Sequence, residues 1–218
     1  KDAVFARAET EGYGGMIMST WLDRPLSAAG RIIVSENGKL VSKLVNLDRT
    51  TLVIPSVAIH MDRTANGGHA WNIQQDLLPL YGTADDSLSL MDAVAAAAQV
   101  EAENILGHDL YLYSRIEGTL WGERHEFISS ARLDDLQCAF AAFRGFTAGK
   151  KEKHICVYAL FDNEEVGSAT NQGAGATFLK NTLTRISRSL GYSYDETQAM
   201  IARSFMISAD NGHALHPN

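Results

Sequence analysis

The chain has 218 residues, of which 45% are hydrophobic, enough for one large domain or two small ones with a packed core. Its formal net charge is -7 and it has no basic stripe, which argues against nucleic acid as a partner. No apolar run reaches eighteen residues and no apolar leader is present, so we expect neither a membrane span nor a signal peptide.

The first half of the chain predicts a β-rich module. Asn37-Gly38 separates two strand-like runs and favours a type I′ hairpin turn, whose two central residues both need positive φ. The alanine-rich stretch 88–106 predicts a helix, with Ser87 or Ser89 as its cap and Gly107 as its end. Strands are expected at 16–21, 31–35, 39–44, 51–54 and 110–117. The module is expected to end near Gly122.

The second half predicts alternating helices and strands. Helical spacing or composition favours helices at 136–147, 171–190 and 195–203. Apolar runs at 154–161 and 205–209 are typical of buried strands. This order indicates an α/β fold with a mostly parallel sheet.

Acidic residues recur where these expected elements begin or end. Glu164 and Glu165 follow the first strand, Asp210 follows the second, and Asp134 lies at a helix start. The carboxyl ends of parallel strands share one edge of a sheet, so we expect these side chains to converge. Crowded carboxylates repel one another unless a cation lies among them.

The residue types suit a metal-dependent hydrolase. Carboxylates together with His213, three residues after Asp210, are donors for zinc, cobalt or manganese. One of two adjacent glutamates can bind metal while the other takes a proton from water. A solvated acidic turn, a helix cap at Asp134, a turn at Asp210 and an ordinary histidine are the structural alternatives. A two-carboxylate glycosidase would leave Asp134, Asp210 and His213 without a role.

Two further features bear on context. Cys138 and Cys156 each lie in an apolar run, and two buried thiols without zinc-knuckle spacing predict a reducing, cytoplasmic compartment. The chain does not begin with Met and stops at His216-Pro217-Asn218, so we expect a piece of a longer protein.

Several motifs resemble the M18 metallopeptidases, the group of aspartyl aminopeptidase and vacuolar aminopeptidase I. They are LFDNEEVGS at 160–168, SADNGHALHPN at 208–218, IPSVAIH at 54–60, and YGG at 13–15 with STWLDR at 19–24. The resemblance covers essentially the whole chain. It implies an α/β catalytic domain with an inserted β-rich dimerisation domain, divided as 1–13, 14–122 and 123–218.

The resemblance also implies roles for particular residues. By position, Asp134 is similar to the carboxylate that bridges two Zn2+ ions per subunit, with Co2+ or Mn2+ as alternatives. Glu165 and Asp210 match ligands of one metal each, and Glu164 matches the general base. His213 matches a substrate-contacting residue, and His60 matches a histidine that one protomer contributes to its neighbour's active site. His60-Met61-Asp62 has His-x-Asp spacing, but it lies in the β-rich half, far in sequence from the acidic residues, so we do not expect it to bind metal.

The implied function is the removal of N-terminal, in part of the family acidic, residues from peptides by dimers that assemble into dodecamers. In the family, one further histidine ligand per metal lies outside the matched range. No His-x-Asp-x-Pro motif precedes Tyr13. We therefore expect these 218 residues alone to be inactive. The alternative is a non-catalytic assembly or interaction module.

Overall fold

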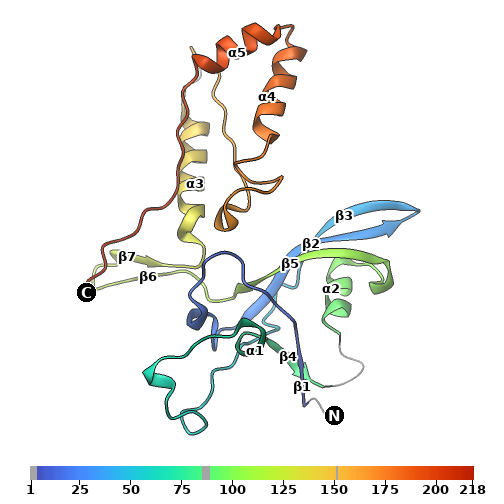
Figure 1. The fold of residues 1–218 in the computed structure, drawn as a ribbon, viewed down its shortest axis with the longest axis vertical. Helices are drawn as coiled ribbons and strands as arrows, with labels where there is room; N and C mark the ends of the chain where they lie inside the picture. Colours follow the sequence, from blue (N-terminus) through green and yellow to red (C-terminus); the bar gives the residue numbers. More distant parts are fainter. Residues whose placement is uncertain (1–3, 85–88, 151) are drawn as a thin grey trace. The chain divides into compact units, whose positions relative to one another are not determined.

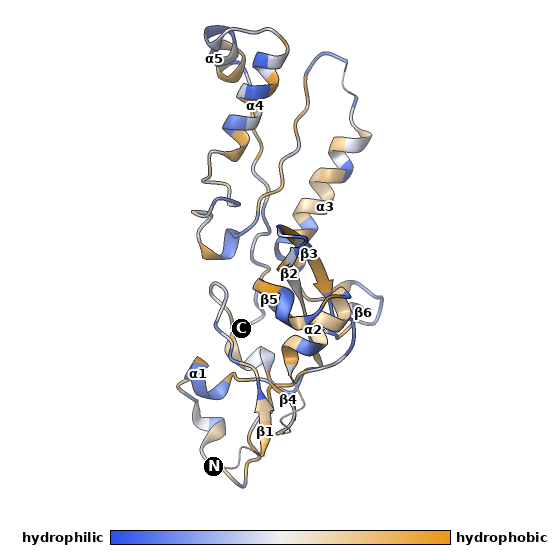
Figure 2. Cartoon of the chain, turned by 90° about the vertical axis from the view of Figure 1, so that its right-hand side faces the viewer, coloured by the Kyte–Doolittle hydropathy of each residue, from blue (hydrophilic) through white to orange (hydrophobic). Residues whose placement is uncertain are grey.

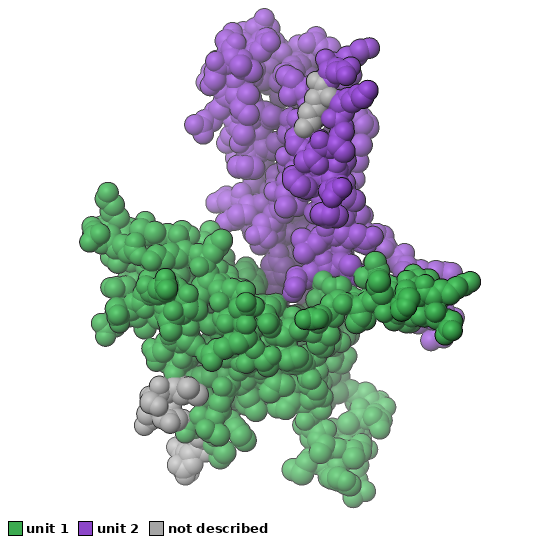
Figure 3. Space-filling view, turned by 180° about the vertical axis from the view of Figure 1, so that it is seen from behind, with its two compact units in different colours: residues 1–12, 16–131 green, residues 13–15, 132–218 purple. Residues whose placement is uncertain are grey.

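The computed structural model describes residues 4–84, 89–150 and 152–218, and it divides into two compact units (Figure 3). Unit 1 comprises residues 1–12 and 16–131, whereas unit 2 comprises residues 13–15 and 132–218. The expected division into functional domains at 14–122 and 123–218 remains a prediction.

Unit 1 consists mainly of antiparallel strands (Figure 1). Its strands are β1 (Phe5–Arg7), β2 (Leu26–Glu36), β3 (Lys39–Asn46), β4 (Leu80–Thr83), β5 (Ile105–Ser114), β6 (Thr119–Trp121) and β7 (Phe127–Ser129). Its helices are α1 (Ile73–Asp76) and α2 (Leu90–Ala98), with short 3-10 turns η1 (Met18–Trp21), η2 (Ala65–Gly67) and η3 (Ala102–Asn104).

The main sheet has the strand order β3-β2-β5, with both neighbours antiparallel to β2. The predicted hairpin turn is confirmed: Asn37 and Gly38 have φ angles of 51° and 73°, and Glu36 pairs with Lys39 across the turn. This is the geometry that the Asn-Gly dipeptide favours, because glycine and asparagine tolerate positive φ best.

The hydrophobic core lies on one face of this sheet. Leu26, Ile32 and Val34 of β2 are fully buried, together with Leu52 and with Val94 of α2. Ile32 and Val34 face inward whereas Arg31 is exposed, because side chains alternate along a strand. Full burial of each such aliphatic side chain contributes about 1.5–3 kcal/mol relative to exposure. Helix α2 therefore covers the sheet and closes the core.

Three elements of unit 1 differ from the sequence-based expectation. Helix α2 begins after its cap Ser89, as predicted, but it ends at Ala98, since Gln99 adopts a left-handed φ of 55° and β5 begins at Ile105. Ile105 and Leu106, which helix propensity alone would have kept helical, belong to β5, which pairs with β2. Ser87, the other expected cap, lies outside the described residues. The expected strand at 16–21 contains the turn η1, and 51–54 forms only isolated bridges.

Unit 2 contains α3 (Leu133–Ala148), η4 (Glu164–Val166), α4 (Phe178–Ser189) and α5 (Tyr194–Ala202). The three predicted helices are confirmed, although α4 begins at Phe178 rather than near 171. The residues before it form turns, in which the amide of Gly175 donates to the carbonyl of Ser168 at 3.0 Å. The buried hydroxyls of Ser187 and Thr197, 2.6 Å apart, join α4 to α5.

The strands expected at 154–161 and 205–209 are wrong for the described residues, which form no strand there. Ile155 is 82% exposed and Phe205 is 86% exposed. A strand needs a hydrogen-bonding neighbour, and the described part of unit 2 offers none. All pairs between named strands are antiparallel, so the mostly parallel sheet is not found among these residues and the structure is mixed α/β.

Unit 2 also lacks a buried apolar core among the described residues. Among the described residues, every buried hydrophobic side chain belongs to unit 1. Helix α4 carries polar and apolar residues on different sides (Figure 2).

Cys138 is half-buried, Cys156 is exposed and both are free, so the expectation of two buried thiols is wrong. None of the described helices has the length and apolar character needed to cross a membrane.

Candidate metal centre

The glutamates of the acidic loop, which we define as residues 162–168, lie in the turn η4. Asn163 precedes this turn with a left-handed φ of 60°, and its carbonyl accepts a hydrogen bond from the Ser168 amide at 2.9 Å. The loop closes on itself in this way and presents Glu164 and Glu165 to solvent. Asp162 is tied back through its amide to the Gln172 carbonyl at 3.0 Å.

Asp134 and Asp135 lie at the beginning of α3, where the backbone is not helical. Their φ/ψ angles are -82°/119° and -110°/16°, and the peptide bond between them is cis. The regular helix therefore starts after both aspartates.

Contacts with the first turn of α3 hold Asp210 nearby. The Cys138 thiol donates to the Asp210 carbonyl at 3.2 Å, and the Cys138 amide donates to Asn211 Oδ1 at 3.4 Å. Asn211 Nδ2 donates to Gln137 Oε1 at 3.0 Å. The segment around Asp210 is thus fixed to the same helix whose start carries Asp134, although the two are far apart in the sequence.

The electrostatics of Asp134 show which groups surround it. Partial loss of water raises the pKa of Asp134, and a hydrogen bond with Asp210 and the charges of Asp210 and Asp135 raise it further. His213 lowers the same pKa, so its imidazole is also close enough to act. Because Asp134 remains exposed, this shift indicates which charges are near rather than a contribution to stability.

Glu164 lies in the same electrostatic environment. Partial loss of water raises its pKa, and the negative charges of Asp210, Glu165, Asp135 and Asp134 add to the shift in that order. A general acid–base group works best when its pKa is near the working pH, and a raised carboxyl pKa moves in that direction. Carboxylates from three separate segments of unit 2 therefore lie close enough for their charges to interact.

Electrostatic effects connect five of the six predicted site residues within unit 2. Asp210 and His213 act on the pKa of Asp134, and Asp210, Glu165 and Asp134 act on the pKa of Glu164. His60 lies in unit 1, in an exposed turn, and its predicted role is not tested. The charge of Asp135, which the sequence analysis does not assign to the site, also acts on the pKa values of Asp134 and Glu164.

The donor chemistry of this cluster fits a divalent metal. Carboxylate oxygens and an imidazole nitrogen are zinc ligands, and a cation would relieve the mutual repulsion of the acids. Within the described ranges, however, no three or more His, Cys, Asp or Glu side chains are already arranged to hold an ion. The cluster supplies suitable ligands, whereas the assignment of individual ligands remains a prediction.

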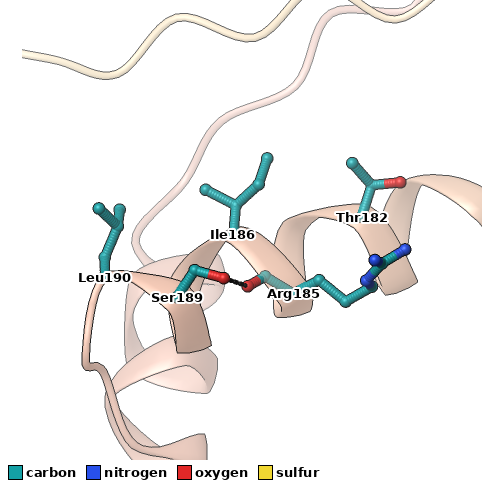
Figure 4. A pocket seen from close by; sticks show the side chains of 5 residues that line it. All are labelled: Thr182, Arg185, Ile186, Ser189 and Leu190. Carbon is teal, nitrogen blue, oxygen red and sulfur yellow. Dashed lines mark hydrogen bonds between the residues drawn. The ribbon is translucent and has the colours of Figure 1, made fainter.

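A shallow hollow lies elsewhere, along α4 (Figure 4). Thr182, Arg185, Ile186, Ser189 and Leu190 line it. The Ser189 hydroxyl donates to the Arg185 carbonyl at 2.9 Å within the helix. The lining contains no carboxylate, thiol or imidazole, so this hollow lacks the groups that acid–base or metal chemistry requires.

Comparison with known proteins gives the cluster a context. The family model described as "Aminopeptidase I zinc metalloprotease (M18)" matches residues 1–218. A probable M18 family aminopeptidase 2 from Clostridium acetobutylicum is 44% identical over 220 residues, covering 98% of this chain and 51% of the relative. Aspartyl aminopeptidase 4 from Saccharomyces cerevisiae is 33% identical over 255 residues, with 98% and 52% covered.

Solved structures agree in fold. A chain in the cryo-EM structure of the Ape4 and Nbr1 complex matches with a TM-score of 0.87 at 32% identity, covering 98% of this chain and 46% of that one. The dodecamer of Saccharomyces cerevisiae mApe1 matches with a TM-score of 0.66 at 27% identity, with 85% and 43% covered. This chain spans about half the length of the curated relatives it matches. By its match over all 218 residues and by these relatives, the chain belongs to the M18 family of aminopeptidases.

Proposed function

We propose that this chain contributes the carboxylate-rich part of a dinuclear zinc aminopeptidase. The observation that carries the proposal is the convergence of Asp134, Glu164 and Asp210 from three segments, in a chain of a family described as zinc metalloproteases. Asp134 would bridge two Zn2+ ions per subunit, while Glu165 and Asp210 would each bind one. Co2+ or Mn2+ are alternatives with the same ligand preference.

The ions, when bound, would supply Lewis acidity that lowers the pKa of a coordinated water from 15.7 to about 7. Glu164 would accept the proton of the attacking water and later donate it to the departing amine. His213, and His60 of a neighbouring protomer, would contact the peptide substrate.

The relatives also support proposals about the substrate specificity and the self-association of the full-length protein. The similarity to a protein named aspartyl aminopeptidase supports an acidic residue at the peptide N-terminus. The similarity to a dodecamer supports self-association of this β-rich region into dimers and dodecamers. The inactivity of the 218 residues alone remains a prediction, as does the cytoplasmic location.

The paired substitutions Glu164→Gln and Glu165→Gln in the full-length protein test this function. Glu164→Gln removes the base but no ligand, so we expect the rate to fall by roughly 10²- to 10⁴-fold with full zinc content. Glu165→Gln removes a ligand, so we expect lower zinc content and partial recovery of activity in excess zinc. Elemental analysis and hydrolysis of an aspartyl peptide, measured side by side, give both quantities.

Each variant is the control for the other, because they differ by one position and share the same chemistry. If Glu164→Gln loses zinc while Glu165→Gln remains fully loaded, the two roles are reversed. If both retain full activity, the acidic loop is not the active site. A full-length protein that binds no zinc and cleaves no peptide would favour the assembly or interaction module instead.

A further inference from the structure

The segment Tyr13-Gly14-Gly15, which we call the glycine segment, belongs to unit 2 although the residues before and after it belong to unit 1. Three residues have too little surface to be held by general burial. Their attachment must therefore depend on a few specific contacts. These contacts are made with the acidic loop.

Gly14 lies directly against the backbone of Glu165. Its φ is +67°, and a Cβ at this position would come within 2.5 Å of the Glu165 carbonyl oxygen and 2.7 Å of Glu165 Cβ. Backbone atoms cannot rotate away as the end of a long side chain can. Only glycine allows both this conformation and this closeness, so any larger residue must push the acidic loop away.

The side-chain amide of Asn163 makes a second contact between the acidic loop and the glycine segment. Asn163 Nδ2 donates to the Tyr13 hydroxyl at 3.4 Å, and the Thr170 hydroxyl donates to Asn163 Oδ1 at 2.7 Å. Both ends of the Asn163 side chain are thus engaged. The residue that opens the turn carrying the two glutamates is held between the glycine segment and Thr170.

We propose that the glycine segment and Thr170 position the acidic loop, with Gly14 and Thr170 as positioning residues that touch neither substrate nor metal. The proposal rests on the function proposed above. Two adjacent glutamates can act as base and ligand only if the backbone between them is fixed, because productive site geometry tolerates only about 0.5 Å of displacement. The close contact at Glu165 and the anchored Asn163 side chain supply that constraint.

Gly14→Ala and Gly15→Ala in the full-length protein form a matched pair. A Cβ at Gly15 would meet no described atom within 4 Å, so Gly15→Ala adds the same methyl group without displacing the loop. We expect Gly14→Ala to lower zinc affinity and kcat by about 10- to 100-fold, as loss of supporting contacts around ligands does elsewhere. We expect a largely unchanged KM and melting temperature. Gly15→Ala should match the wild type.

If Gly14→Ala does not fold, the pair Thr170→Val and Thr170→Ser tests the positioning proposal instead. Valine keeps the shape but loses the hydroxyl that anchors Asn163, whereas serine keeps the hydroxyl. Thr170→Val should weaken zinc binding in a competition titration, and Thr170→Ser should restore it. Wild-type zinc affinity in both Gly14→Ala and Thr170→Val overturns the proposal. So does equal damage from Gly15→Ala, or from Thr170→Ser. If the unmutated full-length protein binds no zinc and has no peptidase activity, the proposed function itself is overturned. Failure of the proposed function can therefore be told apart from failure of the positioning proposal.

Discussion

At the residue scale, the acidic cluster crowds negative charges that a cation would offset. Partial loss of water raises the pKa of Asp134, and the neighbouring Asp210 and Asp135 raise it further. A like charge nearby disfavours ionisation of a carboxyl, whereas an opposite charge favours it. A divalent cation among these side chains would therefore lower the pKa of Asp134, and its binding would release protons.

Ser27 provides a test of a single buried group. Its side chain is completely buried in β2, and its hydroxyl has no hydrogen-bond partner among the described residues. An unsatisfied buried hydroxyl costs about 1–3 kcal/mol. We therefore expect Ser27→Ala to leave the thermal stability of the full-length protein unchanged or to raise it.

Ser35→Ala is the control, because Ser35 lies in the same strand but is half-buried. Its effect should remain within about 0.5 kcal/mol. A clear loss of stability in Ser27→Ala alone, measured by thermal unfolding, would show that the Ser27 hydroxyl has a partner.

At the element scale, α5 has a complete capping box that makes its stability depend on pH. The Ser193 hydroxyl accepts from the Glu196 amide at 3.2 Å, and Glu196 Oε2 accepts from the Ser193 amide at 2.8 Å. The hydrogen bond from the Ser193 backbone lowers the pKa of Glu196, and the bond from its side chain lowers it further. A lowered folded-state pKa means that this stabilisation is present above the unfolded-state pKa, about 4.3 for Glu, and is lost as pH falls through the folded-state value.

We expect hydrogen-exchange protection of the α5 amides to decrease as the pH falls below about 4, after correction for intrinsic exchange rates. Glu196→Gln should reduce protection at neutral pH and remove most of this pH dependence. Asp195→Asn is the matched control, because Asp195 lies in the same first turn outside the capping box. Equal pH dependence in all three proteins would mean that the capping box does not stabilise α5.

At the scale of the whole molecule, the two units differ in how they bury apolar residues. Unit 1 has a closed core, yet its edge strand β3 exposes Leu40 by 73% and Leu44 by 86%. Both leucines lie on the face of β3 opposite the core, since they alternate with the buried Val45. An exposed apolar edge strand favours pairing with another chain.

We expect Leu44→Lys in the full-length protein to shift self-association towards smaller species, since a charge at an apolar contact must be desolvated. Sedimentation velocity at micromolar concentration measures the distribution. Leu44→Met, which keeps the apolar character, should behave as the wild type. An unchanged assembly in Leu44→Lys would place the self-association surface elsewhere.

Local sequence by itself determined the features that depend on nearby residues. The Asn37-Gly38 turn, the Ser89 cap and the three helices of unit 2 follow from turn chemistry, capping and helical spacing, and the M18 motifs identify the family. Their determinants lie within a few residues of the element itself, so the sequence displays them directly.

Only the tertiary structure decided what depends on distant partners. The end of α2 depends on pairing of β5 with β2, and the runs 154–161 and 205–209 remain unpaired because a strand forms only beside another strand. The approach of Asp210 to Asp134 depends on the contacts of Cys138 and Asn211. The docking of Gly14 on Glu165 joins segments about 150 residues apart. No local pattern encodes such contacts, because their energy arises only when both partners have been brought together.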